Sequence, residues 1–353
     1  MRSIALILLL SLAGKARAQQ VELAPSMTTH LDSVRAKYIK SYPDHFFIWP
    51  LIKQRRLDFR LQDTPSHNKL VTYKSNKPYF VGVGLYIFEV VLEITGAVPF
   101  QELSESRYGK TYANDLQLNL FGKQWSVESF RQRYRGFYIS DPDVDIAAGA
   151  PYPQRADLVT RNTGITGSYA FNKKKFSYRS PYNFADTQLR TAGSLMIFGT
   201  LSNFKTRGDS AILGRRYEND FGSNSHIQEF KSTTLSIAPG YSQSFIHKGY
   251  FLNATLALTA APNWVSYRLD DGKEHSSVKL AAFYMARISI GYSAKRWFTA
   301  INYVTQGGNA KYDGIQLLTS SGTMKLLFGY RFREFGILKK RVADIPQLVG
   351  IGK

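Results

Sequence analysis

The fold is decided by the stretch Tyr112-Ala-Asn-Asp-Leu-Gln-Leu-Asn-Leu-Phe-Gly-Lys-Gln-Trp-Ser-Val-Glu-Ser-Phe-Arg-Gln-Arg-Tyr-Arg-Gly-Phe137. Between Asp115 and Leu120 every second residue is a leucine, which places the leucines on one face of a predicted strand. Gly122-Lys123 predicts a tight reversal, and a second polar and aromatic run follows it. Each arm is longer than the five or six residues of a typical soluble strand. Long hairpins of this kind are typical of transmembrane β-barrels.

The N-terminus has the three parts of a secretory signal. Met1-Arg2 is positively charged, residues 4–12 are apolar, and Ala16-Arg17-Ala18 forms a small-residue cleavage site. We expect cleavage after Ala18, so that residues 1–18 are a signal peptide; a buried N-terminal helix is the alternative. No cysteine follows the apolar segment, which excludes a lipoprotein anchor.

Composition favours an all-β membrane protein. The chain has 22 Tyr and 23 Phe but no cysteine, so neither disulfides nor thiolate metal sites support this exported fold. Beyond the signal, no run approaches the ~18 apolar residues of a transmembrane helix. An exported, aromatic-rich chain with these features predicts a single antiparallel up-and-down transmembrane β-barrel. A large soluble periplasmic β-protein is the competing class.

The net charge limits the classes of binding partner that are expected. The formal charge of +20 falls to +17 once Arg2, Lys15 and Arg17 leave with the signal. For an exported protein nucleic acid is not an expected partner. A basic surface at the outer membrane suits outer-membrane lipid, the phosphates of lipopolysaccharide, or anionic solutes. Solvated lysines in turns account for part of the excess.

The predicted domains follow from these patterns. Residues 19–54 are expected to form a periplasmic lead-in with a short helix, or else a plug that folds back into the lumen. Residues 55–332 are the β-barrel, with about twelve strands and ten to fourteen possible. Residues 333–353 are a C-terminal tail. Strands are predicted near 55–62, 70–87, 88–98, 112–137 (the hairpin), 158–171, 176–204, 227–244, 250–267, 277–292, 297–307 and 315–332.

The lengths of the connections suggest an orientation. Short connections are predicted at 122–123, 172–175, 247–249 and 294–296, and they alternate with longer ones at 99–110, 139–157, 205–226, 268–276 and 308–314. Bacterial barrels have short periplasmic turns and longer outside loops, so both termini are expected in the periplasm. The outer-membrane insertion machinery is an expected partner. Many barrels end on the aromatic residue that it recognises, whereas this chain continues beyond Tyr330 and Phe332.

Several short sequence motifs carry a resemblance to one family. They are Asn76-Lys-Pro-Tyr-Phe-Val-Gly-Val-Gly-Leu-Tyr86, Tyr108-Gly-Lys-Thr111, Asp115-Leu116, Tyr134-Arg-Gly-Phe-Tyr138, Arg155-Ala-Asp-Leu158, Phe171-Asn-Lys-Lys-Lys-Phe-Ser-Tyr-Arg179, Gln188 and Ala192-Gly-Ser194. In this set the chain resembles the domain-of-unknown-function 4421 (DUF4421) family, found mainly in Bacteroidetes. The resemblance implies an outer-membrane β-barrel of unknown function and carries no catalytic residues.

No catalytic constellation is visible in the sequence. A hydrolase needs a nucleophile, a base and an orienting group, but the chain has no G-x-S-x-G elbow and its six histidines are scattered. No two histidines have the spacing of a metal pair. His226 lies at a loop edge near Glu229, where it could act as the base of a barrel phospholipase or be a solvated loop histidine. No cofactor is expected.

Asp141, Asp143 and Asp145 place three carboxylates at alternate positions in a predicted outside loop. Oxygen-rich spacing of this kind can bind Ca²⁺, but the glutamate and glycine of an EF-hand loop are missing. A solvated acidic turn is the simpler interpretation.

Arg131, Arg133 and Arg135 are the candidate binding residues, because alternate positions of one strand share a face. If Gly122-Lys123 is a two-residue turn, the arginines face outward near the outer surface, where guanidinium groups could hold lipopolysaccharide phosphates. A one-residue slip would turn them into a basic lumen suited to anions. A structural network with polar residues of neighbouring strands is the third possibility.

Aromatic residues near strand ends predict interfacial girdles, and the candidates are Trp125, Trp264 and Trp297. Core packing in a soluble barrel is the alternative for these rings. The functional hypothesis is an outer-membrane barrel with a structural role or a narrow pore. The alternatives are a barrel enzyme that modifies lipid or lipopolysaccharide and a soluble periplasmic β-protein that binds a partner.

Overall fold

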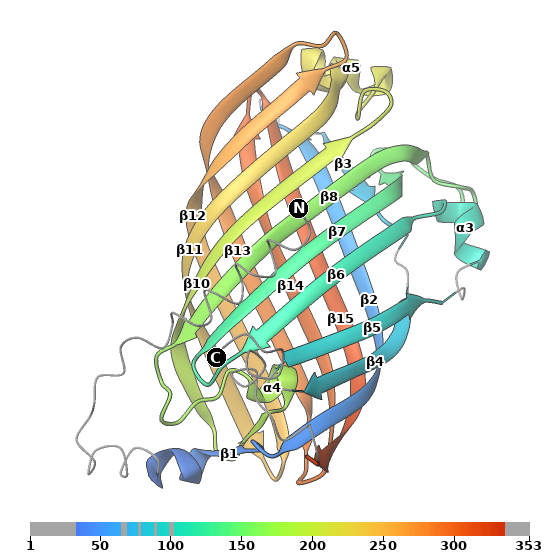
Figure 1. Ribbon diagram of the computed structural model, residues 1–353. Helices are drawn as coiled ribbons and strands as arrows, with labels where there is room; N and C mark the ends of the chain where they lie inside the picture. Colours follow the sequence, from blue (N-terminus) through green and yellow to red (C-terminus); the bar gives the residue numbers. More distant parts are fainter. Residues whose placement is uncertain (1–32, 65–68, 77–78, 88–89, 99–101, 336–353) are drawn as a thin grey trace, which may run out of the picture.

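The protein is a closed antiparallel β-barrel in a computed structural model (Figure 1). The structure describes residues 33–64, 69–76, 79–87, 90–98 and 102–335. Its main sheet has thirteen strands in this part of the chain, and β15 pairs back with β2 to close the ring. The predicted barrel class is therefore confirmed. The predicted signal peptide (residues 1–18) and the chain beyond residue 335 lie outside the described residues.

Long strands form most of the wall. The barrel strands are β2 (His45–Asp63), β3 (Leu70–Lys74), β4 (Tyr79–Ile87), β5 (Val90–Ala97), β6 (Tyr112–Phe121), β7 (Trp125–Ser140), β8 (Gln154–Ala170), β10 (Ala192–Arg207), β11 (Ile227–His247), β12 (Tyr250–Leu269), β13 (Glu274–Ser293), β14 (Trp297–Tyr312) and β15 (Ile315–Arg333). The smaller elements are β1 (Ile39–Ser41), α3 (Glu102–Tyr108), α4 (Ser180–Asn183), β9 (Asp186–Gln188), η1 (Arg215–Tyr217), α5 (Glu218–Phe221) and η2 (Gly222–His226). None of the helices among the described residues is long and apolar enough to cross a membrane.

Strands β3 to β6 interrupt the simple up-and-down order. The end of the barrel with the β12–β13 turn is uppermost in Figure 1 and is called the upper end; the end with the β6–β7 turn is the lower end. β2 pairs with β3 along its upper half and with β4 along its lower half. β3 then pairs directly with β7, whereas β4 is followed by β5 and β6 before β7 is reached. β3 and β4 thus lie beside β2 at the same place in the wall, one above the other. The lower part of the wall therefore has twelve strands.

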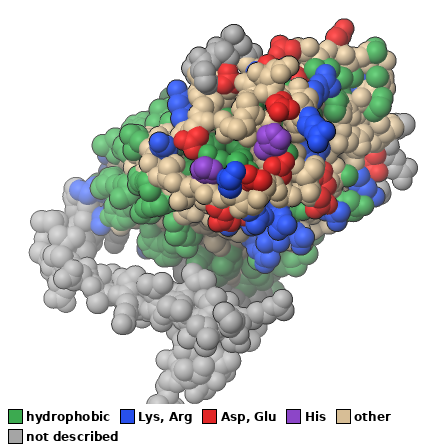
Figure 2. Space-filling model, turned by 90° about the horizontal axis from the view of Figure 1, so that it is seen from above, with side chains coloured by type: hydrophobic (Ala, Val, Ile, Leu, Met, Phe, Trp, Pro, Cys, Tyr) green, Lys and Arg blue, Asp and Glu red, His purple; other side chains and the backbone are tan. Residues whose placement is uncertain are grey.

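The wall is apolar outside and mostly polar inside. On β12, Leu252, Leu256 and Leu258 are exposed, whereas Asn253 and Thr255 between them are buried in the lumen. Alternate residues of a strand point to opposite faces, as expected for the strand predicted at residues 250–267. Seen from above, hydrophobic side chains gather on the flank and charged ones on the upper end (Figure 2).

Two predicted boundaries are wrong. The barrel begins at His45, ten residues before the predicted start, because alternation along β2 already places Phe47 and Trp49 in the interior. Residues 176–204 are not one strand. β10 begins at Ala192. Residues 176–188 of the 171–191 connection lie inside the lower end of the barrel, with Pro181 within α4. The alternating aromatics of 176–178 resemble a strand, but they pack inside the lumen.

We call residues 171–191 the inner plug. Its β9 pairs with β1 of the N-terminal segment, which enters the same end of the barrel after a helix at residues 33–38. Phe184 lies in the left-handed backbone region at φ 60° and stacks on Phe298 with ring centroids 4.1 Å apart. The Phe184 carbonyl accepts hydrogen bonds of 3.3 Å from the Arg331 guanidinium. These contacts hold a backbone conformation that non-glycine residues rarely adopt.

The predicted alternation of connection lengths is also wrong. The inner plug is a long connection at the end where β6–β7, β11–β12 and β13–β14 have short turns. At the other end, residues 270–273 and 313–314 are short turns, because β12 to β15 extend further than predicted. Asp313-Gly314 makes the latter turn with both residues at positive φ.

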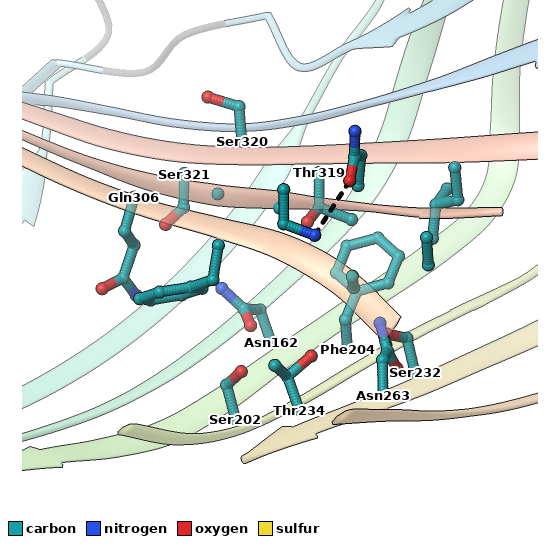
Figure 3. A pocket seen from close by; sticks show the side chains of 18 of the residues that line it. Asn162, Ser202, Phe204, Ser232, Thr234, Asn263, Gln306, Thr319, Ser320 and Ser321 are labelled. Atoms are coloured by element: carbon teal, nitrogen blue, oxygen red, sulfur yellow. Dashed lines mark hydrogen bonds between the residues drawn. The ribbon is translucent and has the colours of Figure 1, made fainter. Parts of the chain in front are cut away.

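Apolar clusters fill both ends of the lumen. The upper core joins wall residues such as Phe59 and Phe204 to Tyr217 and Phe221 of the 208–226 connection. The lower core joins Trp49 and Phe198 to the inner plug. Between them lie two cavities of about 100 and about 50 Å³ that share lining residues. The smaller one is lined mainly by hydroxyl and amide side chains (Figure 3).

Candidate functional site

The structure places Arg131, Arg133 and Arg135 on the outward face of β7, all exposed. The hairpin turn is Lys123-Gln124, closed by a 2.8 Å hydrogen bond from the Gly122 N–H to the Trp125 carbonyl. Leu120 consequently pairs with Val127 rather than with Trp125. This shift of two residues keeps every side chain on its face, because the period of a strand is two.

Register aligns four cations on neighbouring strands. Arg133 of β7 pairs with Arg161 of β8, Arg161 pairs with Lys205 of β10, and Lys205 pairs with Lys231 of β11. All four side chains point outward. Adjacent strands lie about 4.8 Å apart, so four like charges follow one another around the wall. We call this set the cation row.

Below the cation row, the outward residues are first mainly polar and then apolar. The next outward row is Arg131, Thr163, Asn203, Thr233 and Trp264. The row below that contains Ile165, Leu201 and Leu235, each at least 40% exposed. The cation row therefore lies just above an apolar band, with one polar row and a tryptophan between them.

Glu229 is the acid nearest to one end of the cation row. Its carboxylate lies 2.8 Å from Lys205 and 3.2 Å from Lys231, and Arg268 reaches it at 3.4 Å. At the other end, Arg133 and Arg161 form no ion pair with any residue that the structure describes. Like charges directly opposite each other destabilise a sheet, so these two arginines favour an external anion between them.

The predicted interface tryptophans all lie on the outer surface. Trp125 and Trp297 are 48% and 41% exposed near the lower ends of their strands, whereas Trp264 (45%) lies near the upper boundary. Trp297 packs against Tyr292, with ring centroids 4.9 Å apart. Trp49, which was not singled out from the sequence, is buried in the lower core. Gly84 beside it is required, because a Cβ there would lie 2.0 Å from the indole.

The lumen contains a cluster of charged residues that the sequence did not predict. Glu93 accepts a hydrogen bond from Lys325 at 2.6 Å and lies 3.7 Å from Lys53. Nearby, Arg55 pairs with Asp115 at 3.2 Å, and the Glu128–Arg287 pair has a contact of 2.8 Å. These seven residues form the lumen cluster. Glu93 and Lys325 each stand between two outward apolar residues, which indicates an inward charge, but their partners lie too far away in sequence to be inferred.

The three acidic residues of the 141–153 connection do not converge on a metal. Lys69 Nζ lies 2.9 Å from the carboxylate of Asp141 and 2.9 Å from that of Asp143, so an ammonium group occupies the position that a metal ion would need. Burial alone would raise the pKa of Asp141, but hydrogen bonds from Lys69 and from the Asp143 backbone lower it. Among the described residues there is no group of three or more metal-ligating side chains.

His226 has an acidic partner at the upper end. Its Nδ1 lies 3.0 Å from Asp270 Oδ2, and its Nε2 lies 3.9 Å from Glu218. The hydrogen bond to Asp270, with the charge of that carboxylate, raises the pKa of His226 above its usual value near 6.5. Within the described part of the chain, no hydroxyl group is hydrogen-bonded to His226. The His226–Asp270 pair can therefore act as a base, but no nucleophile is bonded to it.

The Asp270→Asn variant should lower the pKa of His226 towards 6.5, because the neutral amide no longer stabilises the imidazolium. A pKa that is raised in the fold means that the pair stabilises the upper end below pH ~6.5 and loses this effect as pH rises through the folded pKa. An NMR titration of the imidazole measures the shift. Glu218→Gln is the control and should shift the pKa less, and an unchanged pKa in Asp270→Asn would contradict the pairing.

Comparisons with known proteins give one family match and several solved structures of low similarity. The family model "Domain of unknown function (DUF4421)" matches residues 30–332. Among curated proteins, none matches the sequence. Similar solved structures include the outer membrane protease OmpT of Escherichia coli, with TM-score 0.44, 10% identity and coverage of 83% of this chain and 98% of that chain. The Pseudomonas putida toluene transporter TodX has TM-score 0.27, 8% identity and coverage of 82% and 90%. The β domain of the Bordetella autotransporter BrkA has TM-score 0.35, 11% identity and coverage of 81% and 99%.

Proposed function

We propose that this chain, which belongs to the DUF4421 family of domains of unknown function, is a sealed outer-membrane barrel that binds lipopolysaccharide phosphates through its cation row. The observation that carries the proposal is the position of this row. Four outward cations in register lie directly above a polar row and an apolar band. The barrel thus presents outward positive charge where anionic headgroups would lie.

The two faces of the wall support a membrane position. Exposed leucines and isoleucines cover the outside, including Leu201, Leu235 and Ile237, while serines, threonines and asparagines line much of the interior. A soluble barrel would need the opposite arrangement, because apolar surface in water is unfavourable. An Arg or Lys at the bilayer midplane costs about 2–4 kcal/mol, so the cations above the band fit the interface and not the hydrocarbon.

The outward tryptophans fit the same frame. Trp125 and Trp297 are near one boundary of the apolar band and Trp264 is near the other. Indole rings prefer the membrane interface, where the ring is in an apolar zone and the N–H meets water. On this basis the end with the short β6–β7 turn is periplasmic, together with the start of β2 and the end of β15.

Lipopolysaccharide phosphate matches the chemistry of the cation row. Arg133 and Arg161 offer planar guanidinium groups with several N–H donors, which suit bidentate contacts to phosphate oxygens. Their mutual repulsion falls when an anion lies between them. Arg131 and Arg135 flank Arg133 on the same face of β7 and extend the basic surface.

Replacing both Arg133 and Arg161 by Gln should weaken binding to vesicles that contain lipid A. Each interfacial cation contributes about 1 kcal/mol, so the double variant should lose about 2 kcal/mol, or roughly 30-fold in affinity. Vesicle co-sedimentation at fixed salt measures the loss. The Lys173→Gln/Lys174→Gln variant is the matched control, because it removes the same charge from the opposite, exposed end of the barrel. Equal losses in both variants would show that only net charge matters.

The filled lumen argues for a sealed barrel rather than a pore. The upper core closes one end and the inner plug closes the other, and the cavities between them are about 100 and about 50 Å³. We therefore expect no conductance steps from the wild-type protein in planar bilayers, with insertion verified by heat-modifiability. Reproducible steps from folded protein would contradict the seal.

The second candidate function is a hydrolase at the outer rim, favoured by the 3.0 Å contact between His226 and Asp270. An imidazole with a carboxylate partner can act as a general base. This candidate requires that purified lipopolysaccharide or phospholipid is cleaved by the wild type and not by His226→Gln. Unchanged substrate after incubation with folded wild-type protein removes it.

A further inference from the structure

The barrel wall has a weak seam between β5 and β6. Among the residues that the structure describes, these strands share only two pairs, Val90 with Leu120 and Val91 with Asn119, whereas β6 and β7 share ten. Above the two pairs the strands separate, and α3 lies in the connection between them (Figure 1). In hydrocarbon, unpaired strand edges are costly, so such a seam needs something that covers it.

A cavity of about 250 Å³ lies in this seam and is lined by residues from both faces of the wall. Its lining includes Ile94 and Leu116, which point outward and are 74% and 66% exposed. It also includes Glu93 and Asp115, whose side chains belong to the lumen cluster. The cavity therefore has an apolar outer mouth and a charged inner end.

The seam cavity and the larger lumen cavity lie side by side and share lining residues. Both are lined by Lys53, Glu93 and Gln117. Gln117 is exposed although Leu116 and Leu118 beside it take the outward face, because the open seam uncovers an inward position. Since the upper core and the inner plug fill the two ends of the lumen, the seam connects the lumen cluster to the surroundings through the side of the wall.

Two buried atoms at this site have no partner among the described residues. Asp115 Oδ1 belongs to a residue that lines the seam cavity, and Arg287 Nε belongs to a residue that lines the lumen cavity. Buried polar groups are almost always hydrogen-bonded, so these atoms indicate that water or a ligand completes the site. Three cations, Lys53, Arg55 and Lys325, line the larger lumen cavity, and Lys53 also lines the seam cavity.

We propose that the β5–β6 seam is a lateral portal that admits one anionic phospholipid from the bilayer, with its phosphate against Lys53, Arg55 and Lys325. The acyl chains remain outside along Ile94 and Leu116, where the wall is apolar. The inference rests on the membrane position given under the proposed function. The lipid covers the strand edges that the seam leaves unpaired. Its phosphate adds acceptors to the three cations, which already contact Glu93 or Asp115.

Single cysteines test the portal, because the natural chain has none. Gln117→Cys reports the inner end of the seam, and Leu116→Cys reports the outward face one residue away. Ser242→Cys is the inward control, fully buried and far from the seam in the β11 wall. Each folded variant is reconstituted in phosphatidylcholine bilayers that contain phosphatidylethanolamine with a maleimide headgroup, and heat-modifiability verifies folding.

We expect Leu116→Cys and Gln117→Cys to be labelled and Ser242→Cys to stay unlabelled. Replacing the host lipid with phosphatidylglycerol should reduce labelling of Gln117→Cys alone, because the anionic host competes for the three cations. An unlabelled Leu116→Cys would contradict the membrane position itself. Labelling of Leu116→Cys with none of Gln117→Cys would overturn the portal. Labelling of Gln117→Cys that is equal in both hosts would overturn recognition of the anionic headgroup.

Discussion

Asp186→Asn should destabilise the inner plug by about 3–5 kcal/mol, because it leaves a buried guanidinium without its counter-charge. The Asp186 side chain is fully buried and receives hydrogen bonds of 2.9 and 2.8 Å from Arg179 and 2.6 Å from Ser177. Arg35 of the N-terminal segment reaches the same carboxylate at 3.3 Å. One carboxylate thus joins the plug to the segment that precedes the barrel.

Amide hydrogen exchange of residues 176–188 measures this effect locally, since opening of the plug does not require the barrel to unfold. Asp271→Asn is the control; it removes an exposed turn carboxylate paired with Lys273 and should change protection little. Burial would raise the pKa of Asp186, but its hydrogen bonds, led by Arg179, lower it. The pair therefore stabilises the plug above pH ~4 and loses this effect as pH falls through the depressed pKa. Unchanged protection in Asp186→Asn would contradict the role of the pair.

The hairpin shows how far sequence patterning reaches. The alternation in residues 112–137 predicted both strands and which residues share a face, but left open whether the arginines face outward. The turn lies one residue later than predicted, which shifts the pairing by two residues and leaves the faces unchanged. It could not align Arg133 with Arg161 and Lys205, because that register depends on where β8 and β10 begin. The start of β10 was placed wrongly, since the inner plug resembled a strand.

The inner plug was missed for a physical reason. Phe176 and Tyr178 alternate with polar residues as in a membrane strand, yet both are buried in the lower core. Pro181 was the contrary signal, because proline is rare inside a central strand. The lumen cluster was beyond sequence analysis altogether: Lys325 meets Glu93 across a separation of 232 residues. Such pairs follow from closure of the ring and not from local pattern.

A depth series along β11 tests the membrane position of the barrel. Ile237 lies near the middle of the strand, is 68% exposed and points outward, and Thr233 occupies the same face at the polar boundary row. An arginine at the midplane of a transmembrane barrel costs about 2–4 kcal/mol, and near the interface it costs about 0–1 kcal/mol. The two variants add the same residue to the same strand and face, so only depth differs.

The most direct measurement of the central claim is the free energy of unfolding of Ile237→Arg and Thr233→Arg in phospholipid vesicles, each relative to the wild type. A barrel that spans the membrane with its cation row at the headgroups predicts a loss of about 2–4 kcal/mol for Ile237→Arg and at most about 1 kcal/mol for Thr233→Arg. Equal small losses at both positions would contradict the account, because they would mean that the outward face of β11 does not lie in hydrocarbon.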